Sequence, residues 1–112
     1  MAKSESPLPR ASFLVLLALS DRPRHGLAIV EHVEESTKGR VKMGPGTLYG
    51  TLQKLEQDGL IKETAEAPDP ADHDTRRRYY RLTPRGGRAL RAEASHLRVL
   101  ADAVADRIGG GR

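Results

Sequence analysis

The chain of 112 residues contains no cysteine and no tryptophan, and only 4% of its residues are aromatic. Without cysteine, disulfide bonds and thiolate chemistry are excluded, which is compatible with a cytoplasmic location. Without tryptophan and with so few aromatic rings, no stacking pocket for a planar ligand is evident. The apolar run at residues 13–19 is far too short to cross a bilayer, and its flanks lack a signal-peptide cleavage site. We therefore predict a cytoplasmic protein with no membrane partner.

The sequence also lacks any recognisable catalytic or metal-binding constellation. Its four histidines do not form a ligand set, and there is no H-E-x-x-H motif, cysteine cluster or P-loop. No nucleophile elbow surrounds any of its serines. We predict that the chain is not an enzyme and that it binds no metal and no cofactor.

Two segments of the chain carry basic residues and no acid. Residues 36–55 contain four basic side chains, which are Lys38, Arg40, Lys42 and Lys54. Residues 75–92 contain seven arginines, at positions 76, 77, 78, 81, 85, 88 and 91, in a chain of net charge +4. Such acid-free segments favour a polyanion as the partner, whereas an isolated charge run usually marks only a solvated face.

Residues 44–60 are the most informative segment, because they predict a helix with two contrasting faces. Pro45 suits the first turn of a helix, and Gly59 suits a left-handed cap at its end. One face carries an apolar stripe of Leu48, Leu52 and Leu55. The opposite face carries Gly46, Gly50, Gln53 and Gln57, flanked by Tyr49 and Lys54. A small, polar face with no acid before Glu56 fits against base edges in a DNA major groove, although an ordinary amphipathic surface helix is the alternative.

Two further helices are expected before this segment. The first, residues 10–19, is apolar nearly all round, so we expect a partner subunit to cover part of it. In the second, residues 25–37, we expect Leu27, Val30 and Val33 to face the core.

Two short strands are expected after the segment, at residues 60–66 and 78–83. A polar loop rich in proline and aspartate joins them, which is the arrangement of a β-wing. Of Tyr79 and Tyr80, we expect one to pack in the core and the other to lie on the wing.

Residues 84–108 predict one long helix, which Pro84 opens. Its apolar positions follow a heptad seam, made of Leu90, Ala94, Leu97, Ala101, Val104 and Ile108. Nothing earlier in the chain is long enough to cover this seam, so we expect the same helix of a second copy to do so. Phe13 and Leu17 of the first helix are expected to join the dimer contact, and packing of the long helix on its own domain is the alternative.

The order of these elements predicts a mainly α chain with a small two-stranded β-wing, an α+β winged helix-turn-helix followed by a C-terminal dimerisation helix. We expect a flexible N-terminus at residues 1–9 and a DNA-binding domain at residues 10–83. The dimerisation helix should occupy residues 84–108, and residues 109–112 should form a disordered tail.

Several short motifs lie along residues 12–92. They read His25-Gly26-Leu27-Ala28-Ile29, Gly46-Thr47-Leu48-Tyr49, Leu55-Glu56, Gly59-Leu60-Ile61 and Arg77-Arg78-Tyr79-Tyr80-Arg81-Leu82-Thr83, followed by Gly86. In this combination the chain resembles the PadR family of transcriptional regulators, and its single C-terminal helix resembles the smaller branch of that family. The resemblance implies a homodimeric winged-helix repressor in a prokaryotic cytoplasm.

The resemblance also implies which residues approach DNA. Tyr49 is expected to bind a phosphate, and Thr47 a phosphate or a base edge. Gln53 suits bidentate pairing with adenine, Lys54 suits a phosphate, and His25 is expected to touch the DNA backbone. The full predicted DNA-binding set is His25, Lys42, Gly46, Thr47, Tyr49, Gly50, Gln53, Lys54, Arg76, Arg77 and Arg78.

The function predicted from these features is sequence-specific DNA binding by a homodimeric transcriptional regulator, most simply a repressor of a palindromic operator in double-stranded DNA. One alternative is a winged-helix adaptor whose basic face binds an acidic protein. Another is a ligand sensor that holds a small apolar effector, of unknown identity, at the dimer interface.

Overall fold

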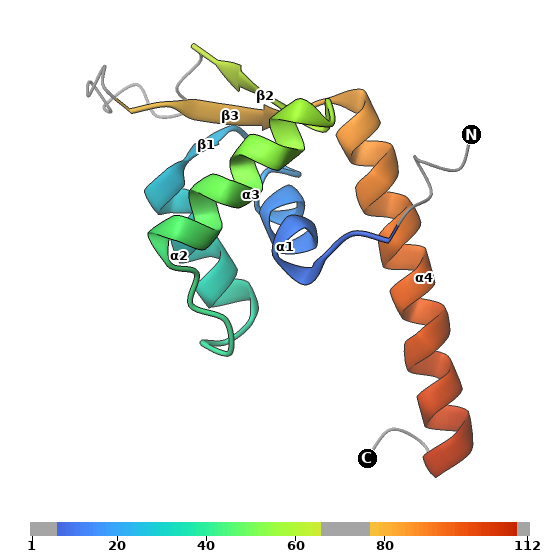
Figure 1. The fold of residues 1–112 in the computed structure, drawn as a ribbon. Helices are drawn as coiled ribbons and strands as arrows, with labels where there is room; N and C mark the ends of the chain where they lie inside the picture. Colours follow the sequence, from blue (N-terminus) through green and yellow to red (C-terminus); the bar gives the residue numbers. More distant parts are fainter. Residues whose placement is uncertain (1–6, 66–76, 110–112) are drawn as a thin grey trace.

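The computed structural model describes residues 7–65 and 77–109. In chain order the elements are α1 (Arg10–Ala18), β1 (Arg24–His25), α2 (Gly26–Ser36), α3 (Pro45–Gln57), β2 (Ile61–Thr64), β3 (Tyr79–Leu82) and α4 (Pro84–Ile108). Figure 1 shows α1, α2 and α3 gathered on one side of the sheet, while α4 extends away from them. The mainly helical fold with a small antiparallel sheet confirms the predicted class. Arg76, residues 1–6 of the predicted N-terminal segment and residues 110–112 of the predicted tail lie outside the described residues.

The sheet has three strands in the order β1-β3-β2, one more than the sequence predicted. In the predicted hairpin, Ile61 lies opposite Leu82 and Thr64 lies opposite Tyr79. The additional strand, β1, is only two residues long, and its Arg24 and His25 pair with Tyr80 and Tyr79. A two-residue strand has no periodicity of its own, so only its pairing with β3 defines it.

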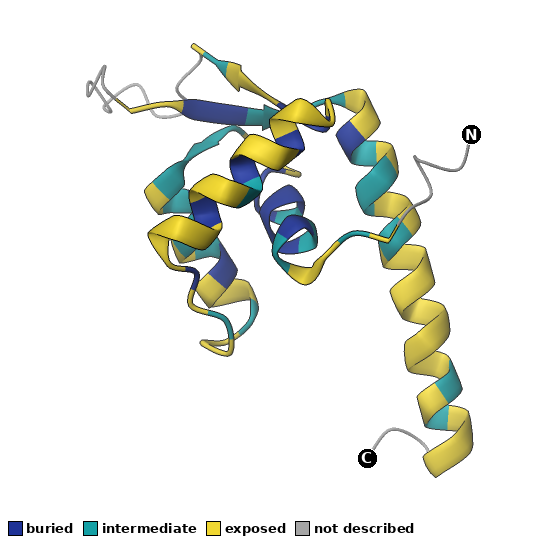
Figure 2. Cartoon of the chain, viewed as in Figure 1, coloured by how far each residue is buried: buried dark blue, intermediate teal, exposed yellow. Residues whose placement is uncertain are grey.

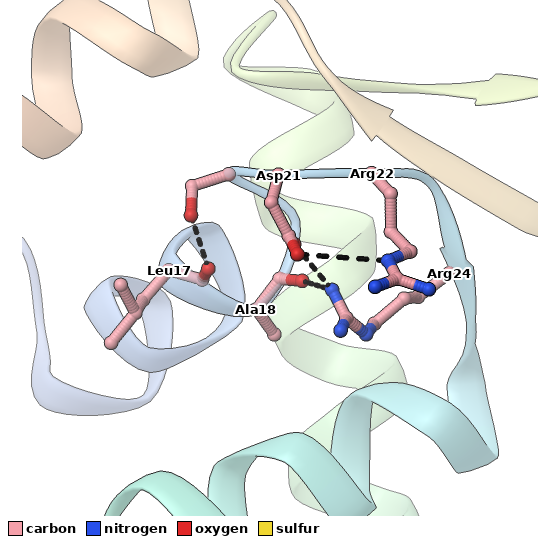
Figure 3. A network of polar contacts seen from close by, with 6 residues as sticks. Leu17, Ala18, Asp21, Arg22 and Arg24 are labelled. Atoms are coloured by element: carbon pink, nitrogen blue, oxygen red, sulfur yellow. Dashed lines mark hydrogen bonds and ion pairs between the residues drawn. The ribbon is translucent and has the colours of Figure 1, made fainter.

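A polar network closes the turn between α1 and β1 (Figure 3). The Ser20 hydroxyl donates a hydrogen bond to the Leu17 carbonyl over 2.7 Å. Nη1 of Arg24 donates to the Ala18 carbonyl and lies 2.7 Å from Oδ1 of Asp21. Nε of Arg22 approaches Oδ2 of the same carboxylate at 3.6 Å. The last carbonyls of α1 thus gain partners that the helix cannot supply, and β1 is tied to the end of α1.

Replacing Asp21 with asparagine should lower stability only where the carboxylate is ionised. The hydrogen bond from Arg24 holds the pKa of Asp21 below its ordinary value of 3.8, so its contribution is present above that pH and is lost as the pH falls through the lowered pKa. Because Asp21 is largely exposed, we expect a small fall in Tm at pH 7 and none at a pH well below 3.8. Thermal melts of both proteins at the two pH values measure this, and an equal difference at both would contradict it.

The core lies where α1 meets α2 and α3, beneath the sheet. Its buried residues are Leu14, Val15, Leu16, Ala18, Leu19, Ile29, Val33, Met43, Leu48, Leu52, Leu55, Leu60, Ile61 and Tyr80. Figure 2 shows these as dark bands on α1 and on the inner faces of α2 and α3, whereas most of α4 is exposed. The leucine stripe predicted for α3 is therefore its inward face, which leaves the opposite face of that helix free for contact.

The prediction that Leu27 faces the core was wrong, since 58% of this residue is exposed. Ile29 and Val33, four residues apart, form the inward face of α2 and are fully buried. Leu27 precedes Ile29 by two residues, which is about 200° around a helix, so it points to solvent. Val30, at the edge of the inward face, is half-buried.

The two tyrosines of β3 are both buried, and, as expected, one of them packs in the core while the other lies on the wing. Tyr80 belongs to the core, and burial raises the pKa of its hydroxyl. Tyr79 points to the other face of the sheet, because successive strand side chains alternate. It is nevertheless only 6% exposed, and the His25 ring packs edge-on against it with ring centroids 5.3 Å apart.

The helix α4 runs for 25 residues and ends at Gly109, which is left-handed with a φ of 86°. Ala89 and Leu90 pack partly against the core, and the backbone N–H of Leu8 donates to Oε1 of Glu93 over 3.3 Å. Beyond this point the helix leaves the body of the chain (Figure 1). Among the described residues, no helix is long and apolar enough to span a membrane.

Candidate nucleic-acid interface

The exposed face of α3 begins where the helix begins. Gly44 is extended and precedes Pro45 at the first helical position, and the first turn contains no acid. The exposed residues on this side are Gly46, Thr47, Tyr49, Gly50, Gln53 and Lys54, all from the predicted DNA-binding set. The unsatisfied N–H groups of a helix start carry partial positive charge, which no carboxylate neutralises in this first turn.

The start of α2 lies directly beside the first turn of α3. A Cβ atom placed on Gly26 would lie 3.2 Å from Cδ2 of Leu48 and 3.3 Å from Oη of Tyr49. The two helices can approach this closely because Gly26 has no side chain. Tyr49 is 59% exposed, and its hydroxyl lies where α2 and α3 meet.

His25 links this meeting point of α2 and α3 to the wing. Its Nδ1 accepts a hydrogen bond from the Ala28 N–H over 3.2 Å and so caps α2. Its Nε2 lies 3.0 Å from Nη1 of Arg77, which is 52 positions further along the chain. The pairing of β1 with β3 brings these two residues together. A continuous series of contacts therefore runs from Tyr49 through Gly26 and His25 to Arg77.

Two basic side chains of this surface take part in weak, exposed ion pairs. Nζ of Lys54 lies 3.6 Å from Oδ2 of Asp58, and Nε of Arg78 lies 3.8 Å from Oε2 of Glu63. All four side chains are about half exposed or more, so these pairs can be exchanged for phosphate at little energetic cost. Lys42 is also exposed, on the connection between α2 and α3.

Two basic residues next to this surface, Lys62 and Arg81, were not among the predicted sites. Lys62 lies opposite Arg81 in the pairing of β2 with β3, so both side chains share the face that carries His25 and Tyr79. Lys62 is exposed and Arg81 is half-buried. The sequence signal was the alternation in both strands, but their register across a long loop could not be derived from it.

The model of the PadR-like family of transcriptional regulators matches residues 15–92 of this chain. The chain belongs to this family. The match covers every residue of the surface described above, and it extends over the first two turns of α4.

Individual relatives of this PadR-like chain support the assignment. The transcriptional regulator Rv3488 of Mycobacterium tuberculosis is 34% identical over 90 residues, which are 80% of this chain and 78% of that protein. An uncharacterised 37.1 kDa protein in transposon TN4556 of Streptomyces fradiae is 38% identical over 103 residues. That match covers 88% of the PadR-like chain but only 27% of the transposon protein.

A solved structure has the same fold. The PadR family transcription regulator from Clostridium difficile R20291 superposes with a TM-score of 0.72, and the match covers 91% of this chain and 100% of that one. The two sequences are 22% identical, so this likeness concerns the fold alone.

The residues predicted for dimerisation fall into two groups in the PadR-like chain. Phe13, Leu17 and Leu90 are half-buried, and Phe13 and Leu90 pack against the core of their own chain. The exposed group lies along α4 and consists of Ala94, Leu97, Ala101, Val104 and Ile108. Ile108, at the far end, is 73% exposed, so this single chain leaves most of the seam uncovered.

A hollow of about 630 Å³ lies between α1, the end of α2 and the middle of α4. Its apolar lining includes Phe13, Leu14, Val41 and Leu97, and its polar lining includes Arg10, Lys38, Arg40 and Glu93. Two of the residues predicted for dimerisation, Phe13 and Leu97, thus face one cavity from different helices.

Within the part of the chain that the structure describes, no group of three potential metal ligands occurs.

Proposed function

We propose that this PadR-like chain is a homodimeric repressor that binds a palindromic operator in a prokaryotic cytoplasm. The observation that carries the proposal is the exposed, acid-free first half of α3, with the contacts that run from Tyr49 through His25 to Arg77 beside it. A smooth helix face next to basic and hydroxyl groups suits the major groove and its phosphate walls.

In this proposal α3 enters the major groove, with its inward leucines held by the core. Gln53 reads a base edge, and adenine offers it the matching donor and acceptor pair. Gly46 and Gly50 permit close approach, and Thr47 contacts a phosphate or a base edge near the groove entrance. Tyr49 and Lys54 contact phosphates.

The flanks of the surface contribute phosphate contacts in the same proposal. His25 lies at the start of α2, and Lys42 lies on the connection that leads to α3. Arg77 and Arg78 approach the adjacent backbone from the wing, after their contacts with His25 and Glu63 exchange for phosphate. Arg76 belongs to the same basic run in the sequence.

The dimer is proposed to form through the hollow beside α1 and through an exposed stripe of α4, which consists of Ala94, Leu97, Ala101, Val104 and Ile108. The stripe extends beyond the body of the chain. The hollow, which Phe13 and Leu97 line, lies beside the N-terminal part of this stripe. A two-fold axis through paired α4 helices would present two copies of α3 to successive major grooves, about 34 Å apart. The ligand-sensor alternative would place a small apolar effector in this same hollow.

The first test is binding to DNA by fluorescence anisotropy across a salt series. The affinity of the protein is measured for an operator selected from a random duplex library and for a scrambled duplex of equal composition. We expect tight binding to the operator, with an affinity that falls steeply as salt rises. Equal, weak binding to both duplexes would instead favour the adaptor alternative.

A second experiment distinguishes a repressor from an activator. We expect transcription from an operator-bearing promoter to fall when the protein is added, whereas a rise would indicate an activator.

Two alanine variants should separate base reading from phosphate binding. We expect Gln53→Ala to weaken operator binding by about 1–3 kcal/mol and to relax the base preference at one position of each half-site. We expect Lys54→Ala to weaken operator and scrambled duplexes alike and to lower the salt slope by about one per protomer. Both side chains are exposed on the same helix, so they are matched in their effect on folding. If Gln53→Ala behaved as Lys54→Ala does, its assignment to a base would be wrong.

A further inference from the structure

The recognition helix α3 ends where the long helix α4 begins (Figure 1). Four residues form this meeting point, which we call the α3–α4 joint: Gly59, Leu60, Thr83 and Gly86. Gly59 follows α3 in the left-handed conformation, with a φ of 76°, and Thr83 is the N-cap of α4. The joint thus connects two helices that the proposed function uses for different purposes.

Thr83 bonds to both sides of the joint at once. Its hydroxyl donates to the Gly59 carbonyl over 2.7 Å and accepts from the Gly86 N–H over 3.0 Å. Its backbone N–H donates to the Leu60 carbonyl over 3.1 Å. Gly59 and Leu60 are themselves bonded to the last turn of α3, through the carbonyls of Glu56 and Leu55. One side chain therefore caps α4 and holds the end of α3.

The backbones on the two sides of the joint are also in direct contact. A Cβ atom on Gly86 would lie 2.0 Å from the Leu60 carbonyl oxygen, so the first turn of α4 rests directly on the chain that leaves α3. Nη1 of Arg85 would lie 3.8 Å from a Cβ on Gly59, which puts its positive charge near the C-terminal end of α3. The helix α1 also packs against both α3 and α4, and the backbone contact and hydrogen bonds of the joint add a direct link between these two helices.

Small rotations at the joint have large consequences at the other end of α4. A helix of 25 residues is about 37 Å long, and a rotation of about 10° at one end moves the other end by about 6 Å. That is nearly two steps of the DNA duplex at about 3.4 Å each. The separation of two α3 helices in a dimer joined through α4 is therefore sensitive to the geometry of this joint.

We propose that Thr83 is a positioning residue for operator recognition, which sets the half-site spacing that the dimer accepts by locking α3 to α4. This inference rests on the proposed function, because it needs a dimer joined through α4 and DNA read by α3. Thr83 itself makes no DNA contact in it, and the hydroxyl acts through the carbonyl of Gly59 and the N–H of Gly86.

The test compares Thr83→Val, which removes the hydroxyl, with Thr83→Ser, which keeps it. Affinity is measured by anisotropy for the selected operator, for operators whose half-sites are one or two base pairs closer or further apart, and for a single half-site. We expect Thr83→Val to reduce the preference for the selected spacing by at least about fivefold. Its affinity for the single half-site should stay close to that of the wild type, and Thr83→Ser should keep the wild-type preference.

A second variant separates the two bonds of Thr83. Aspartate is a good N-cap, so Thr83→Asp keeps the cap on α4, but its carboxylate cannot donate to the Gly59 carbonyl. It should lose the spacing preference as Thr83→Val does, and it serves as the test if the valine variant does not fold. The ratio between spacings cancels the effect of the added charge on DNA binding in general.

The outcomes distinguish this inference from the proposed function. A wild-type protein that binds operator and scrambled duplex equally overturns both. A wild-type protein that prefers its operator, together with variants that keep the spacing preference or lose affinity equally at every spacing, overturns only the role of Thr83.

Discussion

Gly86→Ala is expected to destabilise the protein by about 3 kcal/mol or more, which is a severe effect for the addition of one methyl group. The new Cβ would lie 2.0 Å from the Leu60 carbonyl oxygen and 2.9 Å from Cδ1 of Leu82. A side-chain atom can move aside, but the carbonyl belongs to the backbone between α3 and β2. The start of α4 must therefore shift, which breaks the bond between the Gly86 N–H and Thr83.

The neighbouring glycine provides a matched control. A Cβ on Gly87 would meet only Cδ2 of Leu82, at an ordinary contact distance of 3.8 Å. Alanine is favoured over glycine inside a helix, so Gly87→Ala should leave stability unchanged or raise it by up to about 1 kcal/mol. Urea unfolding followed by circular dichroism measures both variants. Equal stability of the two would show that the backbone contact at Gly86 does not constrain the fold.

The double variant Leu97→Asp with Val104→Asp is expected to convert the proposed dimer into a monomer. Both residues belong to the exposed stripe of α4, one heptad (about two helical turns) apart, and are 41% and 54% exposed in the single chain. A dimer that covered this stripe would have to bury four unpaired carboxylates, which is strongly unfavourable. Sedimentation equilibrium should give the mass of one chain, and affinity for the palindrome should fall at least about 100-fold because the second half-site is no longer bound by the same particle.

Val99→Asp is the control for the position of the charge. Val99 is 64% exposed on the same helix but lies about 200° around it from Leu97, away from the stripe. Two copies of this variant should still associate and bind the palindrome. If Val99→Asp separated the copies while the double variant remained a dimer, the interface would lie on the other face of α4.

Local signals were sufficient to predict the helix that is proposed to read DNA. Pro45 and Gly59 mark its ends, and the spacing of Leu48, Leu52 and Leu55 defines its buried face. Each of these signals acts within one or two turns of the chain, so the predicted and observed helices agree closely. The long helix was predicted for the same reason, since Pro84 opens it and its apolar positions repeat at short spacing.

The errors occurred where contacts between distant segments determine the outcome. Leu27 was assigned to the core because it is apolar, but α2 packs against α1 with Ile29 and Val33 on its inward face. The burial of Tyr79 on the wing was not predicted, because it involves the ring of His25, 54 positions earlier. Strand β1 forms because it pairs with β3, and its two residues are too few to carry a sequence pattern that would predict a strand.

The sequence by itself determined the family, the order of the helices and wing strands, and the set of side chains proposed to bind DNA, because these depend on local spacing and residue type. The tertiary structure decided how that set is arranged. Sheet pairing brought Arg77 to His25, the absence of a side chain at Gly26 let Tyr49 approach α2, and Thr83 and Gly86 joined α4 to the end of α3. These arrangements depend on close packing and directional hydrogen bonds between residues far apart in the chain, and such contacts exist only once the core has formed.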